Sequence, residues 1–169
     1  MMHSGYGDSE PLGPWTAHLE SMNHALAERD PHASIGAWRQ AYSAALSDPG
    51  WRGLLAVATA ALRLRALPGY TGDAVARARE TSWIAFFRAR QQRSLEGVLS
   101  AATVFESVGD HAAFENSMRV AEMLATRTGQ AAGQDCLRDF MERLGNKDGP
   151  KDGTLGSGVL RVDTPIAAS

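Results

Sequence analysis

Residues 98–125 read VLSAATVFESVGDHAAFENSMRVAEMLA, two similar halves joined by a short polar break. Apolar or small residues recur three or four positions apart in each half, at Val98, Ala102 and Phe105 and then at Phe114, Met118 and Ala121. This spacing places such residues on one face of an α-helix. Gly109-Asp110 stands between the halves, where glycine favours the end of one helix and aspartate the start of the next. The stretch therefore predicts two antiparallel helices joined by a tight turn and packed against each other.

The same three- and four-residue spacing continues over most of the chain on both sides of this stretch. Alternating runs of β-branched residues are absent from the sequence, so we expect an all-α fold. We predict three helix hairpins, 14–29 with 31–47, 51–67 with 73–92, and 94–108 with 110–127, followed by a last helix over 130–144. Short connections predict that consecutive helices pack antiparallel.

Residues that start and stop helices support these boundaries. Four residues have side chains that can cap a helix N-terminus: Asp30, Asp73, Ser94 and Asp110. Pro31 follows the first of them at the first helical position, which suits proline. Gly129 and Gly145 are expected to end the last two helices.

The hairpins recur along the chain. The three aspartates that precede the second helix of each hairpin, Asp30, Asp73 and Asp110, lie 43 and 37 residues apart. A helix hairpin that repeats at such intervals is typical of an α-solenoid. In such an array the last helix covers an exposed apolar end. A polar outer face suits this capping role, and the last predicted helix offers one at Gln130, Asp135, Arg138, Asp139, Glu142 and Arg143.

Residues 98–125 resemble a tetratricopeptide (TPR) repeat. Val98, Ala102 and Phe105 stand at the family's apolar, small and aromatic positions, Gly109-Asp110 at its turn, and Met118 and Ala121 at second-helix positions. The stretch departs from the family at Phe114, where a small residue is usual, and no proline closes the repeat. The first hairpin matches at Ser34, Trp38, Ala41 and Asp48-Pro49; the second matches in outline. The resemblance implies a scaffold that binds a peptide or protein.

Composition favours one globular domain. The 169 residues are 44% hydrophobic and 21% charged, with a formal net charge of −2. This balance argues against broad nucleic-acid binding, which requires clustered positive charge.

Met1 to Glu10 lacks the basic and apolar regions of a secretory signal, and no apolar stretch is long enough for a membrane helix. We expect a cytoplasmic protein, and the many arginines against two lysines are typical of a GC-rich bacterial genome.

Positive charge is concentrated in the middle hairpin. Residues 51–93 carry eight arginines and two acids, whereas 1–50 and 94–145 each carry a net charge of −4. In one interpretation, the middle hairpin forms ion pairs with its acidic neighbours. In the other, arginines bind an acidic partner, because the planar guanidinium matches a carboxylate. For that second interpretation we select Arg63, Arg77, Arg79, Arg88 and Phe87 as partner-binding residues.

Aromatic residues are expected mainly in the core. Phe86 and Phe87 are adjacent, so a one-sided helix cannot turn both inward, and one of them should meet a neighbouring hairpin or a partner. Trp51 follows a Pro-Gly turn at the start of a helix and is expected to be partly exposed.

No catalytic or metal-binding pattern is present in the sequence. The five histidines show no HxxxH or HExxH spacing, and Cys136 is the sole cysteine. A nucleophile elbow and a phosphate-binding glycine loop are also missing. We therefore predict a non-catalytic protein that needs no cofactor or metal.

The last residues form a separate segment. Residues 146–169 are rich in glycine, aspartate, lysine, serine and proline, so we expect a flexible tail, as for residues 1–12. Within it, Thr154-Leu155, Gly158 and Leu160-Arg161 resemble the C-terminal targeting peptides of encapsulin cargo proteins, although Ser157 and Val159 depart from that pattern. The resemblance implies docking through Leu155, Gly158, Leu160 and Arg161. An idle tail and a tail folded onto the chain's own groove are the alternatives.

The sequence thus predicts a TPR-like helical-repeat domain over 13–145. Its expected function is to bind a partner peptide or helix through apolar groove residues and the middle arginines. The alternative function is a cargo or adaptor that docks into a larger, encapsulin-like assembly through its tail.

Overall fold

The fold is entirely helical in the part of the chain that the structure, a computed structural model, describes, residues 13–127 and 131–147. The helices are α1 (Thr16–Ala27), α2 (Pro31–Ser47), α3 (Arg52–Arg63), the short 3-10 helix η1 (Leu64–Ala66), α4 (Thr71–Gln91), α5 (Leu95–Ser107), α6 (His111–Arg127) and α7 (Ala131–Lys147). The all-α prediction is confirmed, and the helix bounds lie close to those expected. Tails were predicted over 1–12 and 146–169; residues 146–147 belong to α7, and 1–12 and 148–169 lie outside the described residues.

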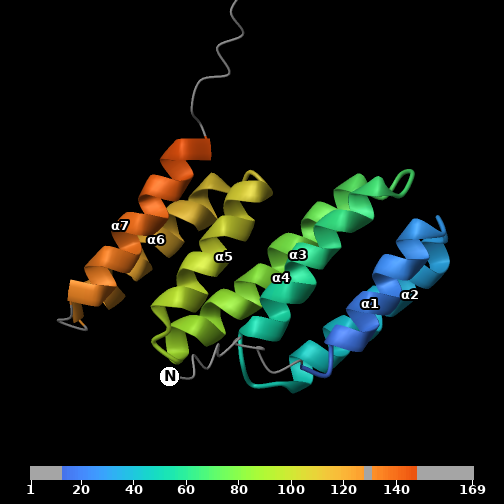
Figure 1. Cartoon of the computed structure of the whole chain (residues 1–169), viewed down its shortest axis with the longest axis horizontal. Coiled ribbons are helices and arrows are strands. Elements are labelled where there is room, and N and C mark those ends of the chain that lie inside the picture. The colour runs from blue at the N-terminus through green and yellow to red at the C-terminus, as the bar shows by residue number, and fades with distance from the viewer. Residues whose placement is uncertain (1–12, 128–130, 148–169) are drawn as a thin grey trace, which may run out of the picture.

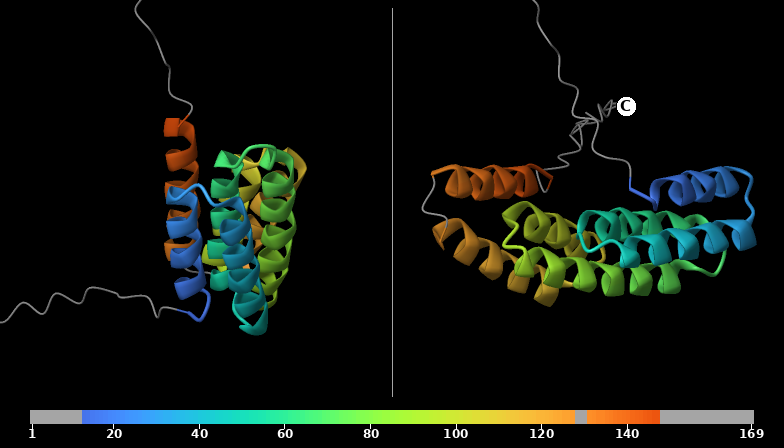
Figure 2. Two further views of the ribbon diagram at one scale, coloured as in Figure 1. Left: turned by 90° about the vertical axis from the view of Figure 1, so that its right-hand side faces the viewer. Right: turned by 90° about the horizontal axis from the view of Figure 1, so that it is seen from below.

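Consecutive helices run antiparallel and lie side by side in chain order (Figure 1). The closest packing is within the pairs α1–α2, α3–α4 and α5–α6. Seen from below in Figure 2, α2, α4 and α6 follow one curved side of the molecule, and α3 and α5 lie on the inner side of that curve. The helices α1 and α7 rise at its two ends. α3 also touches α5, so the first helices of the second and third hairpins are in contact.

The helix starts follow the capping chemistry of the sequence at three of the four predicted positions. Asp30 Oδ1 accepts a hydrogen bond from Ala33 N at 2.9 Å, Ser94 Oγ from Gly97 N at 3.0 Å, and Asp110 Oδ1 from Ala113 N at 3.1 Å. Asp73 is the exception, because α4 begins two residues earlier and Asp73 lies within its first turn. There its negative charge still favours the positive end of the helix dipole.

Two further expectations about boundaries and burial are corrected. Gly145 does not end the last helix, since α7 continues to Lys147. Trp51 is only 6% exposed, although a partly exposed side chain was expected. The reason is tertiary: its ring packs against the first turn of α5, which lies 46 residues further along the chain.

Tryptophans join successive hairpins by the same kind of contact at two places. Trp15, just before α1, packs on Gly53 in the first turn of α3, where an added Cβ would lie 2.6 Å from ring atom Cε3. Trp51, just before α3, packs on Gly97 in the first turn of α5, where an added Cβ would lie 2.7 Å from ring atoms Cδ2 and Cε2. We call each of these contacts a Trp–Gly junction. Only glycine leaves room for an aromatic ring this close to a helix backbone.

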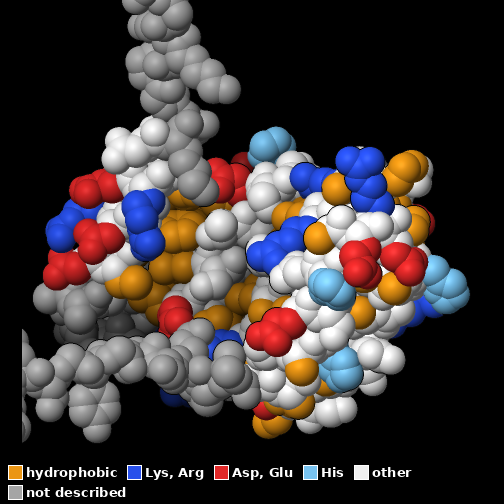
Figure 3. All heavy atoms as spheres, turned by 45° about the vertical axis from the view of Figure 1, so that its right-hand side comes forward, with side chains coloured by type: hydrophobic (Ala, Val, Ile, Leu, Met, Phe, Trp, Pro, Cys, Tyr) orange, Lys and Arg blue, Asp and Glu red, His pale blue; other side chains and the backbone are white. Residues whose placement is uncertain are grey.

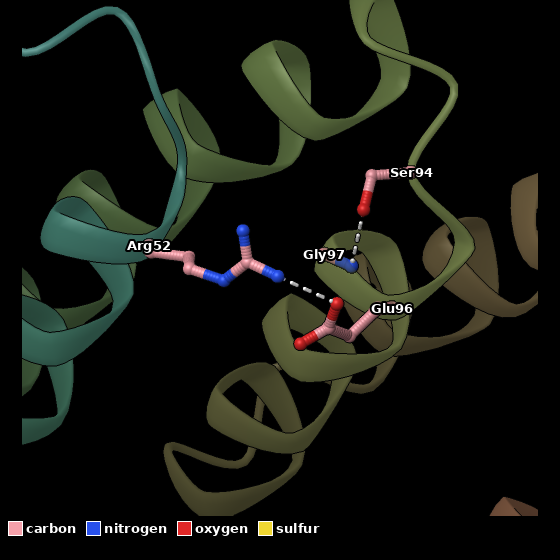
Figure 4. A network of polar contacts seen from close by, with 4 residues as sticks. All are labelled: Arg52, Ser94, Glu96 and Gly97. Atoms are coloured by element: carbon pink, nitrogen blue, oxygen red, sulfur yellow. Dashed lines mark hydrogen bonds and ion pairs between the residues drawn. The ribbon is translucent and has the colours of Figure 1, made fainter. Parts of the chain in front are cut away.

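Polar contacts strengthen these connections between hairpins. Beside the second junction, Arg52 Nη2 forms an ion pair with Glu96 Oε2 at 2.9 Å, next to the Ser94 cap of α5 (Figure 4). Between the first and second hairpins, the buried Trp38 indole donates a hydrogen bond from Nε1 to the carbonyl of Val57 at 3.0 Å. The helices are therefore fixed relative to one another by contacts that cross from one hairpin to the next.

The core follows the apolar stripes predicted from the sequence. Its largest fully buried side chains are Phe86, Phe105, Met22, Leu54 and Leu64. Many of the other buried residues are alanines, which let neighbouring helices approach closely. The predicted polar outer face of α7 is confirmed for Asp135, Arg138, Asp139, Glu142 and Arg143, all of which are exposed. Gln130 lies outside the described residues.

Candidate functional site

The arginines selected as partner-binding residues bind different parts of the fold. Arg77 Nε donates to the Tyr70 hydroxyl at 2.8 Å, and its guanidinium lies 5.1 Å from the centroid of the Trp38 ring. Arg63 Nη1 donates to Asn23 Oδ1 at 2.8 Å, and Arg79 Nε pairs with Asp110 Oδ2 at 3.1 Å. These contacts reach the first hairpin on one side and the third hairpin on the other. Among them, Arg79–Asp110 is an ion pair of the kind that the intramolecular interpretation of the basic middle hairpin predicts.

Arg88 holds the C-terminal end of α2. Its guanidinium donates to the backbone carbonyls of Leu46 at 3.0 Å and Gly50 at 3.1 Å, to that of Asp48, and more weakly to that of Ala45 at 3.4 Å. Gln92 Nε2, from the residue that caps the C-terminus of α4, donates to the carbonyl of Pro49 at 3.0 Å. The last carbonyls of a helix have no partner within the helix, so a cation placed here satisfies them and complements the helix dipole.

Replacing Arg88 by alanine should therefore destabilise the fold. We expect a loss of about 1.5–3 kcal/mol in the free energy of unfolding, since several half-buried carbonyls lose a charged donor. The matched control is Arg90→Ala, two residues along the same helix and exposed, for which a change within about 0.5 kcal/mol is expected. Urea unfolding followed by circular dichroism measures both. Equal effects of the two substitutions would show that the carbonyl contacts add nothing.

Phe87, the one apolar residue among those selected, remains substantially exposed. Its side chain is 50% exposed, whereas neighbouring Phe86 is fully buried, which confirms that the two do not both face inward. The ring of Phe87 is stacked on that of Trp83, with centroids 5.7 Å apart and planes 26° apart. A large aromatic side chain in this position is a candidate anchor for a partner.

Phe87 belongs to a line of residues on one side of α4. Arg79, Trp83, Phe87 and Arg90 are spaced four, four and three residues apart, so they fall within a narrow strip of the helix surface. Arg79, Phe87 and Arg90 are exposed and Trp83 is half-buried. We call these four residues the α4 stripe. Trp83 and Arg90 were not among the selected residues, but their helical spacing from Phe87 was a signal that could have found them.

A second apolar area lies on the concave side of the molecule. In Figure 3, apolar side chains gather in a hollow between α7 and the end formed by α1 and α2. The predicted tail-docking residues Leu155, Gly158, Leu160 and Arg161 lie outside the described residues.

Metal-ligating side chains do not cluster in the part of the chain that the structure describes. Over 13–127 and 131–147, no three or more histidine, cysteine, aspartate or glutamate residues are placed to hold a metal ion. Cys136 is exposed on α7.

The fold and these surfaces define an all-helical protein with an exposed aromatic and arginine face. Comparison with known proteins adds no family: no family model, curated protein or solved structure matches the chain. Among the helices over 13–127 and 131–147, none has both the length and the apolar character needed to cross a bilayer.

Proposed function

We propose that the chain is a TPR-like helical-repeat protein of the cytoplasm that acts without catalysis and binds a peptide or helix of a partner protein. The observation that carries this proposal is the repeated Trp–Gly junction. Trp15 on Gly53 and Trp51 on Gly97 are contacts of the same kind, one between the first and second hairpins and one between the second and third. Successive hairpins joined in one way are the defining property of a helical repeat array.

The exposed surface supports a binding role. Curved arrays of helices present extended faces to partners, and here such faces carry an apolar hollow on the concave side and the α4 stripe. Large exposed aromatics flanked by arginine are enriched where proteins bind one another. The alternative, docking into an encapsulin-like shell through residues 154–161, rests on the sequence of that segment alone.

An affinity capture from native lysate tests the proposal. The full chain is compared with a chain ending at Lys147, which keeps all of α7 and removes only residues beyond the described helices. We expect both to retain the same partner, identified by mass spectrometry, because the binding faces lie on the helices. A partner held only by the full chain would contradict the proposal, and if it were a shell protein it would favour the alternative.

A further inference from the structure

The α4 stripe combines exposure with a fixed shape. Phe87 stacks on Trp83, and the Trp83 ring is itself held at 5.5 Å from the buried Phe86 and at 4.8 Å from the buried Phe105. The Phe86 and Phe87 rings are also in contact, at 5.5 Å. The exposed ring of Phe87 is therefore held in place by aromatic side chains that are themselves packed in the core. A side chain held in place before binding loses less conformational entropy when a partner covers it.

Arginines lie on both sides of this ring along α4. Arg79 and Arg90 are eleven residues apart on α4, which corresponds to about 16 Å along a helix axis. Arg79 is 45% exposed and is held in position by the ion pair from its Nε to Asp110, while Arg90 is exposed near the C-terminal end of α4. Asp110 is paired with Arg79, and Glu80, next to Arg79 along α4, is exposed.

We propose that the α4 stripe is the docking surface for the partner, and that it takes a peptide segment with an apolar side chain flanked on both sides by carboxylates. The inference rests on the proposed binding function and names its site and ligand chemistry. The apolar side chain covers the exposed face of Phe87. One carboxylate lies beside Arg79, whose two Nη atoms can bind it while Nε stays paired with Asp110. The other lies beside Arg90, whose guanidinium can bind it by two hydrogen bonds.

A peptide is favoured over a lipid surface because a single aromatic side chain protrudes. Trp83 is half-buried and packed against the core, which leaves Phe87 as the exposed apolar contact of the stripe. Membrane-surface helices instead insert a broad apolar face. A compact aromatic contact with charged groups around it has the form of a protein-binding hot spot.

Selection of peptides from a random twelve-residue display library against the full chain tests the inference and does not require an identified partner. We expect enriched peptides to carry an apolar or aromatic residue with aspartate or glutamate on both sides. Their affinities are then measured by fluorescence anisotropy for the wild type, Phe87→Ala and Arg90→Glu. The matched controls are Met123→Ala, an exposed apolar residue of α6, and Arg39→Glu, an exposed arginine of α2.

The expected result is a loss of affinity confined to the stripe. Phe87→Ala should weaken binding about tenfold or more, as for an interface anchor. Arg90→Glu should weaken it about tenfold at low salt and less at 0.5 M salt, because ions screen exposed charges. Both controls should bind as the wild type does. Circular dichroism confirms that each variant is folded, and Arg90→Glu carries the test if Phe87→Ala does not fold.

Three results would overturn the inference, and they separate it from the proposed function. If the enriched peptides bind Phe87→Ala and Arg90→Glu as tightly as they bind the wild type, the α4 stripe is not the docking surface. The proposed binding function would be unaffected by that result. Enriched peptides without carboxylates would remove the proposed ligand chemistry. A failure to enrich any peptide, together with Phe87-dependent binding to phosphatidylserine vesicles, would remove both the inference and the proposed function.

Discussion

Replacing Phe86 by alanine is expected to lower the free energy of unfolding by about 3–5 kcal/mol, the range for a phenylalanine removed from a packed core. Phe86 is fully buried in α4, and its ring lies 5.5 Å from that of Trp83 in an edge-on arrangement. The substitution leaves a cavity beside Trp83, which itself packs on Phe105 of α5. Urea unfolding followed by circular dichroism measures the loss.

The adjacent residue provides a control of the same chemical type. Phe87 also contacts Trp83, but half of its side chain faces solvent. Phe87→Ala should therefore cost about 1 kcal/mol, because less apolar area is lost from the protein interior. If both substitutions destabilised the protein equally, the orientation of α4 described above would be wrong. The small expected effect of Phe87→Ala on stability also makes this variant suitable for binding experiments.

The second large effect is expected at the Trp–Gly junction between α3 and α5. In Gly97→Ala the new Cβ would lie 2.6 Å from the Cβ of Ala89 and 2.7 Å from the ring of Trp51. Neither neighbour is the end of a flexible side chain, so the helices themselves must move apart. We expect a loss of about 1–3 kcal/mol, the usual effect of overpacking a core, measured as a shift of the urea midpoint.

Gly36→Ala is the matched control for this prediction. Gly36 lies within α2, and an added Cβ would meet nothing within 4 Å. Alanine there should stabilise the fold by about 0.5–1 kcal/mol, because glycine loses more backbone entropy in a helix. The two glycine substitutions are thus expected to act in opposite directions. A stabilising Gly97→Ala would contradict the close approach of Trp51 to α5.

Features set by neighbouring residues could be predicted from the sequence. The caps at Asp30, Ser94 and Asp110 depend on a backbone amide three residues away, and all three are present. The division between Phe86 and Phe87 follows from helical geometry alone and is also confirmed. The rule that a capping side chain marks the helix start fails at α4. This helix begins at Thr71 after Tyr70, which makes no side-chain cap hydrogen bond, and the predicted cap Asp73 lies in its first turn.

Features set by distant residues could not be predicted. Arg88 binds carbonyls about forty residues earlier in the chain, and an arginine in a basic helix looks the same in sequence whether it faces a partner or a helix end. The burial of Trp51 depends likewise on Gly97, which carries no signal of its own. Of the five residues selected for partner binding, only Arg79 and Phe87 lie together on the α4 stripe. Whether they bind a partner stays a prediction.

The Trp–Gly junction also bears on how such a chain can be lengthened or shortened. Each junction takes its tryptophan from one hairpin and its glycine from the next, so a single hairpin is an incomplete module. A segment that starts at one junction tryptophan and ends just before the next, such as 15–50, contains Trp15. The glycine on which Trp15 packs, Gly53, lies in the following segment. Gene duplication with boundaries just before these tryptophans would keep Trp51 and Gly53 in one segment and so preserve both junctions. A boundary between Trp51 and Gly53 would separate the two junction residues that the middle hairpin supplies.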